Sequence, residues 1–270
     1  MKFLALLLLV ALSMVIVPAA AHAKIVTEAV PYEHDGVKLE GFIAYDDATE
    51  EKRPGVLVIH EWWGLNDYAK MRAKQLAEMG YVAMAVDMYG AGVLAKTQPE
   101  AAALAGKVRG NPKLMRERAR AAFDLLSSNK RVDPSRIAAI GFCFGGTCVL
   151  ELAYSGAELA GAVTFHGGLT APQSDDLERI KAKFLVLHGA DDPLVPPAAV
   201  QAYEEGMRKA NADWELIAYG GAVHTFSNPA AGTENKARGV AYDAKAAERS
   251  WQHMHMFFRE IFAKELAGKK

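Results

Sequence analysis

Short, continuous runs of hydrophobic residues recur along the chain, separated by amphipathic stretches. Runs of this length are typical of strands that are buried on both faces, as in parallel sheets. They lie at residues 55–59, 81–86, 137–140, 160–165, 184–187 and 214–218. Before them, residues 37–45 alternate between hydrophobic and polar positions after the turn sequence His34-Asp35-Gly36. Together with residues 25–30, they predict an opening antiparallel hairpin.

The amphipathic stretches predict helices. Residues 67–79 repeat hydrophobic positions at intervals of three and four, and Gly80 stands where a glycine commonly follows a helix. Residues 112–126 and 197–207 begin with proline, which is tolerated at a first helical position, and residues 239–266 read as a long amphipathic closing helix. This alternation indicates an α/β fold: a doubly wound, mostly parallel sheet with an N-terminal antiparallel hairpin. Ligands of such sheets bind beyond the carboxyl ends of the strands.

Composition narrows the class of protein further. The 270 residues carry 31 basic and 32 acidic side chains, so the chain has no basic surplus with which to bind nucleic acid. A charged fraction of 23% excludes both a polytopic membrane protein and a disordered chain. Two cysteines are too few for a disulfide scaffold or a four-thiolate zinc site. No linker or repeat interrupts residues 24–270, so we expect a single domain there.

Residues 1–23 have the features of a secretory signal peptide. Lys2 supplies the positive start, residues 3–17 are hydrophobic apart from Ser13, and Ala21-His22-Ala23 has the small residues that signal peptidase reads. The alternative is a membrane anchor, but about 15 apolar residues fall short of the roughly 20 that span a bilayer. We therefore expect cleavage before Lys24, export to the periplasm or beyond the cell, and a mature chain that does not bind membranes.

A cysteine framed by glycines follows the run at 137–140. In Gly141-Phe142-Cys143-Phe144-Gly145-Gly146, glycines stand two residues before and two residues after Cys143. This frame is typical of a nucleophile elbow, a strained strand-to-helix turn whose backbone packs too tightly for side chains. The helix expected at residues 147–154 would favour the thiolate through its N-terminus. The alternative interpretation is a small cysteine that is buried by close packing.

Two later strand ends supply a carboxylate and a base. The run at 184–187 leads into His188-Gly189-Ala190-Asp191-Asp192-Pro193, and the run at 214–218 leads into Gly220-Gly221-Ala222-Val223-His224. The order nucleophile, acid, histidine is that of the α/β-hydrolase triad. We therefore assign the acid position to Asp192, in preference to Asp191, and the base position to His224.

The first parallel strand is followed by His60-Glu61-Trp62-Trp63-Gly64. In an α/β-hydrolase this loop supplies one backbone N–H of the oxyanion hole, and the residue after the nucleophile supplies the other. These positions are Trp62 and Phe144. Glu61 is unusual here, since a carboxylate that faces a thiolate opposes its formation.

The motifs at 60–64 and 141–146, with Gly189-x-x-Asp192 and His224-x-Phe226, resemble the dienelactone hydrolase family. The similarity runs from about Tyr32 to Phe262, most of the mature chain. It implies a hydrolase that opens an ester or lactone through a triad of Cys143, His224 and Asp192 and an acyl-enzyme, without a cofactor. It also implies that Glu61 holds the resting thiol and acts in its activation.

One feature of the family is missing. Members that act on dienelactone hold the substrate carboxylate with two arginines, one just after an Asp-x-Tyr and one four residues past the catalytic histidine. The corresponding stretches, 87–92 and 224–228, contain no arginine. We therefore expect a more neutral pocket, unless Arg109 or Arg238 reaches it, and a preference for uncharged short-chain esters or lactones. Its candidate walls are Trp62, Trp63, Tyr89 and Asn228; for the aromatic residues, ordinary core packing is the alternative.

Other functions stay open. A thioesterase or a general carboxylesterase could use the same triad. A non-catalytic binding protein of this fold usually lacks at least one triad residue, and none is missing here. The histidines at 60, 166, 188 and 224 gather near strand ends, but no His-x-x-x-His or Glu-x-x-His spacing supports a metal site. We therefore expect no bound metal and a small-molecule substrate as the partner. The sequence gives no indication of the oligomeric state.

Overall fold

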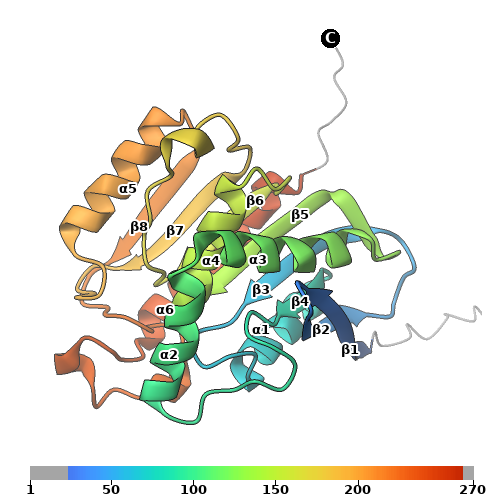
Figure 1. Cartoon of the computed structure of the whole chain (residues 1–270), viewed down its shortest axis with the longest axis horizontal. Helices are drawn as coiled ribbons and strands as arrows, with labels where there is room; N and C mark the ends of the chain where they lie inside the picture. The colour runs from blue at the N-terminus through green and yellow to red at the C-terminus, as the bar shows by residue number, and fades with distance from the viewer. Residues whose placement is uncertain (1–23, 264–270) are drawn as a thin grey trace, which may run out of the picture.

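Eight strands form one sheet in the order β1-β2-β4-β3-β5-β6-β7-β8 in the computed structural model, which describes residues 24–263 (Figure 1). The strands are β1 (Ile25–His34), β2 (Val37–Asp46), β3 (Arg53–Ile59), β4 (Val82–Val86), β5 (Val132–Phe142), β6 (Gly161–Phe165), β7 (Lys183–Gly189) and β8 (Trp214–Tyr219). Strand β2 pairs antiparallel with β1 and with β4, and all other pairs are parallel. The predicted α/β-hydrolase type of fold, with its N-terminal hairpin, is confirmed.

Helices connect and cover these strands. They are α1 (Asp67–Glu78), α2 (Gln98–Arg109), α3 (Pro112–Ser127), α4 (Phe144–Tyr154), α5 (Pro197–Lys209) and α6 (Ala244–Ile261), with short 3-10 turns at Ser174–Asp176, Pro229–Ala231 and Lys236–Arg238. Within residues 24–263, no helix is long and apolar enough to cross a membrane.

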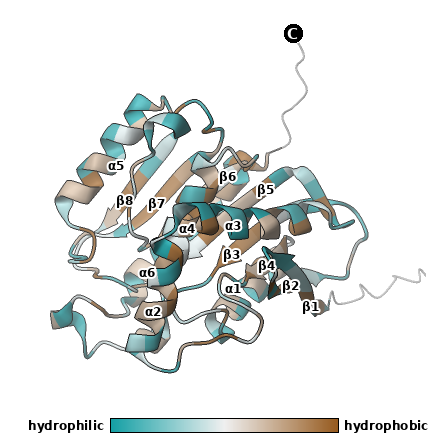
Figure 2. Ribbon diagram, viewed as in Figure 1, coloured by the Kyte–Doolittle hydropathy of each residue, from teal (hydrophilic) through white to brown (hydrophobic). Residues whose placement is uncertain are grey.

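Alternate side chains of the central strands pack into two separate hydrophobic cores, one on each face of the sheet. In β3, Val56 and Val58 pack with α1 and α6, whereas Leu57 and Ile59 pack with α3, α4 and α5. Figure 1 shows α3 and α4 in front of the sheet and α6 behind it, and Figure 2 shows β3 and β7 as largely hydrophobic. Because both faces are covered, these strands read as continuous hydrophobic runs in the sequence.

The closing helix is shorter than its pattern predicted. It begins at Ala244 rather than at residue 239, because the side chain of Asp243 caps it by accepting a hydrogen bond of 2.9 Å from the N–H of Ala246. The preceding residues pair with the loop after β8 instead, and a short bridge joins Val240 to His224. Residues 264–266 of the predicted helix lie outside the described residues.

Helix α2 was absent from the sequence prediction, although its start carries a recognisable signal. The hydroxyl of Thr97 accepts a hydrogen bond from Glu100 N–H, and the Glu100 carboxylate accepts one of 2.8 Å from Lys96 N–H. The buried face of the helix is made of small residues, chiefly Ala101 and Ala105. Alanines give a weak hydrophobic pattern, so the cap was the only strong signal.

The carboxyl ends of the parallel strands meet at one edge of the sheet. Strand β3 leads into the loop that carries Glu61 and Trp62, and β5 leads into Cys143. Strand β7 leads toward Asp192, and β8 leads toward His224. The fold thus gathers the four strand-end motifs into one region.

Candidate active site

Cys143 occupies a strained backbone position between β5 and α4. Its φ of 52° and ψ of −113° are values that residues with a side chain rarely adopt. Its N–H donates a hydrogen bond of 3.0 Å to the carbonyl of Phe165 on the neighbouring strand β6, which helps to hold the turn. This is the geometry of a nucleophile elbow, in which a sharp turn presents the side chain at the end of the strand.

The glycines that frame Cys143 are required by close backbone packing. A Cβ on Gly145 would collide with the carbonyl oxygens of Ile59 and His60, and a Cβ on Gly141 would collide with the carbonyl of Gly145. Helix α4 therefore approaches the end of β3 more closely than a side chain would allow. This approach sets the loop after β3 beside the start of α4.

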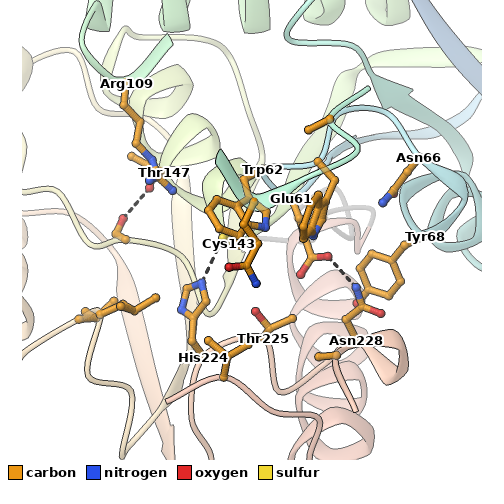
Figure 3. A pocket seen from close by; sticks show the side chains of 18 of the residues that line it. Glu61, Trp62, Asn66, Tyr68, Arg109, Cys143, Thr147, His224, Thr225 and Asn228 are labelled. Atoms are coloured by element: carbon orange, nitrogen blue, oxygen red, sulfur yellow. Dashed lines mark hydrogen bonds between the residues drawn. The ribbon is translucent and has the colours of Figure 1, made fainter. Parts of the chain in front are cut away.

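Cys143, His224 and Asp192 form a hydrogen-bonded row. The Sγ of Cys143 lies 3.1 Å from Nε2 of His224, and Nδ1 of His224 lies 2.7 Å from Oδ2 of Asp192. Figure 3 shows the His224 ring directed at Cys143. The second carboxylate oxygen of Asp192 accepts a hydrogen bond of 2.8 Å from the N–H of Leu194. All three residues of the row are buried, whereas Asp191, the alternative acid, is exposed.

The charge state of His224 is set by its two partners. Burial acts to lower the pKa of His224, but the negative charge of the Cys143 thiolate and the hydrogen bond to Asp192 outweigh burial and raise the pKa to about 10. The imidazolium form of His224 is therefore favoured at neutral pH. A cysteine paired with an imidazolium can supply both a nucleophile and an acid for a leaving group.

Two backbone N–H groups near Cys143 are available to a ligand. The N–H of Phe144 opens α4, where the first N–H groups have no partner within the helix. The N–H of Trp62 lies in the loop after β3. Neither N–H donates a hydrogen bond to another group within residues 24–263. Trp62 and Cys143 line one cavity, so these two N–H groups are the candidate oxyanion-hole donors.

Glu61 lies in the wall of the same cavity and is hydrogen-bonded to Asn228. Nδ2 of Asn228 donates to Oε2 of Glu61 at 2.6 Å (Figure 3). Burial raises the pKa of Glu61 to about 7, although this hydrogen bond and the positive charges of His224 and Arg72 act to lower it. The thiol of Cys143 is paired with His224. This arrangement differs from the role of holding the resting thiol that the family resemblance implies for Glu61.

A cavity of about 1330 Å³ opens at this edge of the sheet. Cys143, Trp63 and Asn228 lie in its wall. Tyr89, which we expected to contact substrate, does not line the cavity. Its buried phenol instead donates a hydrogen bond of 3.1 Å to the carbonyl of Trp62. The expectation for Tyr89 was therefore wrong, because the residue supports the loop that forms the wall.

Two arginines reach the cavity, which is the condition under which we did not expect a more neutral pocket. Arg109, at the end of α2, and Arg238, in the turn Lys236–Arg238, both line the cavity. The guanidinium carbon of Arg109 lies 5.6 Å from the ring centroid of Phe144, the residue after Cys143. Both arginines come from segments other than those that carry the family's arginines, so no motif could place them here.

Sequence reasoning gave no role to His166, which contacts the backbone of Cys143. The N–H of Cys143 also donates to Nδ1 of His166 at 3.2 Å, and Nε2 of His166 lies 2.7 Å from the hydroxyl of Ser227. The pairing of Phe142 with Phe165 between β5 and β6 sets His166 beside Cys143. No local motif signals this contact, because it depends on which strands are neighbours.

Within residues 24–263, no group of three or more His, Cys, Asp or Glu is placed to hold a metal ion. Cys143 and Cys148 are both buried and free, and Cys148 lies inside α4, within the stretch 147–154 that was expected to be helical.

Comparisons with known proteins agree with the fold and the motifs. The model of the dienelactone hydrolase family matches residues 39–262. A protein of Saccharolobus solfataricus named "Putative carboxymethylenebutenolidase" is 27% identical over 263 residues, covering 85% of this chain and 97% of the relative. The crystal structure of a dienelactone hydrolase-like promiscuous phosphotriesterase from metagenomic libraries is 41% identical with a TM-score of 0.84, covering 88% of this chain and 98% of that one.

A more distant structure shows how far the fold extends. A dienelactone hydrolase structure from Klebsiella pneumoniae, itself described as putative, has a TM-score of 0.73 at 24% identity, covering 88% of this chain and 99% of that one. The family match spans the loop after β3, the nucleophile turn and the loops after β7 and β8. The chain therefore belongs to the dienelactone hydrolase family and is a hydrolase that acts on ester bonds.

Proposed function

We propose that the enzyme opens small esters or lactones with Cys143 as the nucleophile. In this proposal His224 is the acid and base, and Asp192 orients His224 and stabilises its protonated form. The observation that carries this proposal is the buried row with contacts of 3.1 Å and 2.7 Å. It begins at a strained cysteine in the wall of an open cavity. A triad is recognised by this geometry and by the roles of its members.

In the first half of the reaction, the thiolate of Cys143 attacks the carbonyl carbon. A C–S bond forms and the carbonyl electrons move to oxygen, where the N–H groups of Trp62 and Phe144 stabilise the negative charge. Collapse of this intermediate breaks the C–O bond, and the departing oxygen takes the proton from Nε2 of His224. An ester releases its alcohol at this point, whereas a lactone keeps the alcohol attached to the acyl group.

In the second half, the neutral His224 accepts a proton from water, and the hydroxide adds to the thioester carbon. Collapse of this second intermediate breaks the C–S bond and releases the carboxylic acid. The products are the acid, the thiolate of Cys143 and the imidazolium of His224, so the starting state is restored.

The experiment is a hydrolysis screen of small esters, lactones and thioesters with purified protein spanning residues 24–270. The proposal expects ester or lactone turnover and a mass increase equal to the acyl group on Cys143 in protein quenched during turnover. A thioesterase or a general carboxylesterase would rank the same panel differently. Turnover that survives Cys143→Ala would contradict the role of the cysteine.

A second candidate activity is the hydrolysis of phosphate triesters. The relative at 41% identity is described as a promiscuous phosphotriesterase, and the cavity of about 1330 Å³ has room for a bulky neutral phosphorus centre beside Cys143. An aryl dialkyl phosphate in the same screen tests this activity. Release of the phenol that depends on Cys143 would support it.

We further propose that the protein is exported and that its mature form begins at Lys24. The proposal rests on residues 1–23, which lie outside the described residues, and on the small residues Ala21 and Ala23. Intact mass spectrometry of protein from the native export route should find residues 1–23 absent. Retention of this segment would favour a membrane anchor instead.

A further inference from the structure

His60 is adjacent to both candidate oxyanion-hole residues and is fully buried. Its Nδ1 lies 2.5 Å from the carbonyl oxygen of Glu61, and its Nε2 accepts a hydrogen bond of 3.2 Å from the N–H of Met88. The imidazole also stacks on the ring of Phe144, with 5.7 Å between ring centroids and 22° between ring planes. The ring therefore contacts the peptide that carries Trp62 N–H and the side chain of Phe144.

The protonation of His60 follows from these contacts. The backbone N–H of Met88 can only donate, so Nε2 must be the unprotonated nitrogen. Burial lowers the pKa of His60 to about 4, although the hydrogen bond to Glu61 and the charge of Asp87 act to raise it. The ring is therefore neutral at neutral pH, and its single proton is on Nδ1. That proton is donated to the carbonyl oxygen of Glu61.

Holding this carbonyl fixes the direction of the next N–H. The carbonyl of Glu61 and the N–H of Trp62 belong to one planar peptide, and no peptide bond within residues 24–263 is cis. In a trans peptide the two groups point in opposite directions. With the carbonyl turned toward the buried ring of His60, the N–H points away from that ring, and Trp62 itself lines the cavity. Tyr89 holds the following carbonyl, that of Trp62, in the same way.

We propose that His60 is a positioning residue that keeps the oxyanion hole formed, by holding the Glu61–Trp62 peptide with its N–H toward the reacting carbonyl. If this peptide flipped, its oxygen would face the negative charge that develops during acyl transfer, and a stabilising donor would become a repulsive acceptor. The proposal rests on the acyl-transfer function proposed above.

Two reactions of Cys143 separate this role from a general effect on folding. Hydrolysis of an ester places negative charge on the carbonyl oxygen and needs the hole. Alkylation of the thiolate by iodoacetamide occurs at a tetrahedral carbon and needs only the thiolate. A defect in the hole should therefore slow hydrolysis and leave alkylation unchanged, whereas a disordered site would slow both reactions.

Two substitutions of His60 each retain one of its two hydrogen bonds and remove the other. In His60→Asn, the side-chain amide can occupy the place of Nδ1 and still donate to the carbonyl of Glu61, but it cannot reach Met88. In His60→Gln, the longer side chain can accept from the N–H of Met88 but leaves the Glu61 carbonyl without its donor. The change His253→Gln, on α6, is a matched control away from the cavity.

Removing one oxyanion-hole donor costs about 10²–10³ in kcat, so we expect His60→Gln to lose on the order of 10² in kcat and His60→Asn to stay within about tenfold of wild type. Both variants should match wild type in the rate of Cys143 alkylation and in its pH profile. The proposal is overturned if His60→Gln retains wild-type kcat. It is also overturned if hydrolysis and alkylation fall together in folded protein, as judged by circular dichroism.

A measurement on the unmodified protein covers the case in which a variant does not fold. Nitrogen-15 NMR of the histidine side chains should find His60 protonated at Nδ1 and not at Nε2. The opposite tautomer would overturn the proposal, since Nδ1 could not then donate to Glu61. If wild-type protein hydrolysed no ester, the proposed function would fail, and the tautomer would still decide whether His60 holds this peptide.

Discussion

The amide of Asn228 donates a hydrogen bond of 2.6 Å to Oε2 of Glu61, and Oε1 of the same carboxylate has no partner among the described residues. One hydrogen bond does not compensate the removal of a carboxylate from water. Burial accordingly raises the pKa of Glu61 from its usual 4.5 to about 7, against the opposing effects of Asn228, His224 and Arg72. Glu61 therefore changes charge near neutral pH, within the wall that holds the nucleophile.

This relationship predicts a pH-dependent stability difference between wild type and Glu61→Gln. Between pH 4.5 and about 7 the folded protein keeps a proton on Glu61 that the unfolded chain has lost. The resulting stability is fully present below the unfolded pKa and is lost as pH rises through the folded one. At 1.36 kcal/mol per pKa unit, the variant should gain about 3 kcal/mol relative to wild type across this range.

Urea unfolding of both proteins at about pH 5 and about pH 8 measures this difference. Glutamine keeps the size of the side chain and an acceptor for Asn228, so packing is little changed. The matched control is Glu215→Gln, at an exposed position on β8, which should show no such trend. A Glu61→Gln difference that is constant with pH would contradict the prediction.

The contact between His224 and Asp192 predicts the alkaline limb of activity. In the proposed mechanism the imidazolium gives a proton to the departing oxygen, and the pKa of His224, about 10, depends on the charges of Cys143 and Asp192. We therefore expect kcat/KM to fall as pH rises through about 10 in wild type, and to fall at lower pH in Asp192→Asn. Steady-state kinetics from neutral to strongly alkaline pH, with Cys143→Ala as the blank, measures both limbs.

The neighbouring carboxylate provides the control for this experiment. Asp191 is exposed and adjacent in sequence, so Asp191→Asn changes the local charge equally without touching His224. Its alkaline limb should coincide with that of wild type. If the alkaline limb shifted equally in Asp192→Asn and in Asp191→Asn, then net charge, and not the hydrogen bond from His224 to Asp192, would set the pKa of His224.

The two cysteines should differ completely in their effect on turnover. Cys143→Ala removes the proposed nucleophile and should lower ester hydrolysis by at least about 10³-fold. Cys148 is fully buried within α4, so Cys148→Ala should leave kcat/KM close to wild type and cost only about 1 kcal/mol in stability, through the lost packing of one sulfur atom. Activity assays combined with urea unfolding distinguish a catalytic loss from a folding loss.

How much of the site could be predicted depends on how its residues are brought together. Cys143, Asp192 and His224 each follow a hydrophobic run within a short motif, so local spacing was enough to single them out. The contact of His166 with Cys143 depends on the pairing of β5 with β6, which no local spacing encodes. The same holds for the hydrogen bond between Glu61 and Asn228, since its partners lie 167 residues apart.

The start of the closing helix and the role of Tyr89 were predicted wrongly, and each error has a specific physical reason. Hydrophobic periodicity continues back to residue 239, but Gly239 takes a left-handed φ of 82° and Asp243 caps the helix that follows. Tyr89 is a residue type that often lines pockets, yet its hydroxyl donates a hydrogen bond to the carbonyl of Trp62, so the residue supports the loop that forms the cavity wall. In both cases a single backbone contact outweighs the pattern.

The arginines of the cavity wall should make turnover depend on the charge of the substrate. Arg109 and Arg238 line the cavity that contains Cys143, so a carboxylate on the substrate could meet a cation there. We expect Arg109→Met to lower kcat/KM for a carboxylate-bearing ester by about tenfold, equivalent to about 1.4 kcal/mol of transition-state binding, and to spare its neutral analogue. Arg238→Met, in the same cavity wall, is assayed in the same way.

The comparison uses one matched pair of esters that differ only in an added carboxylate, so changes in the nucleophile cancel in the ratio of the two kcat/KM values. Methionine keeps the apolar stem of arginine, and therefore much of the packing of Arg109 on Phe144. The control is Arg208→Met on α5, where the arginine pairs with Glu204 away from the cavity. An acid-to-neutral ratio that is the same in wild type and in both cavity variants would restore the original expectation of a pocket that recognises uncharged substrates. A ratio that falls only in the cavity variants would mean that cations from α2 or from the loop after β8 take the place of the arginines that this chain lacks.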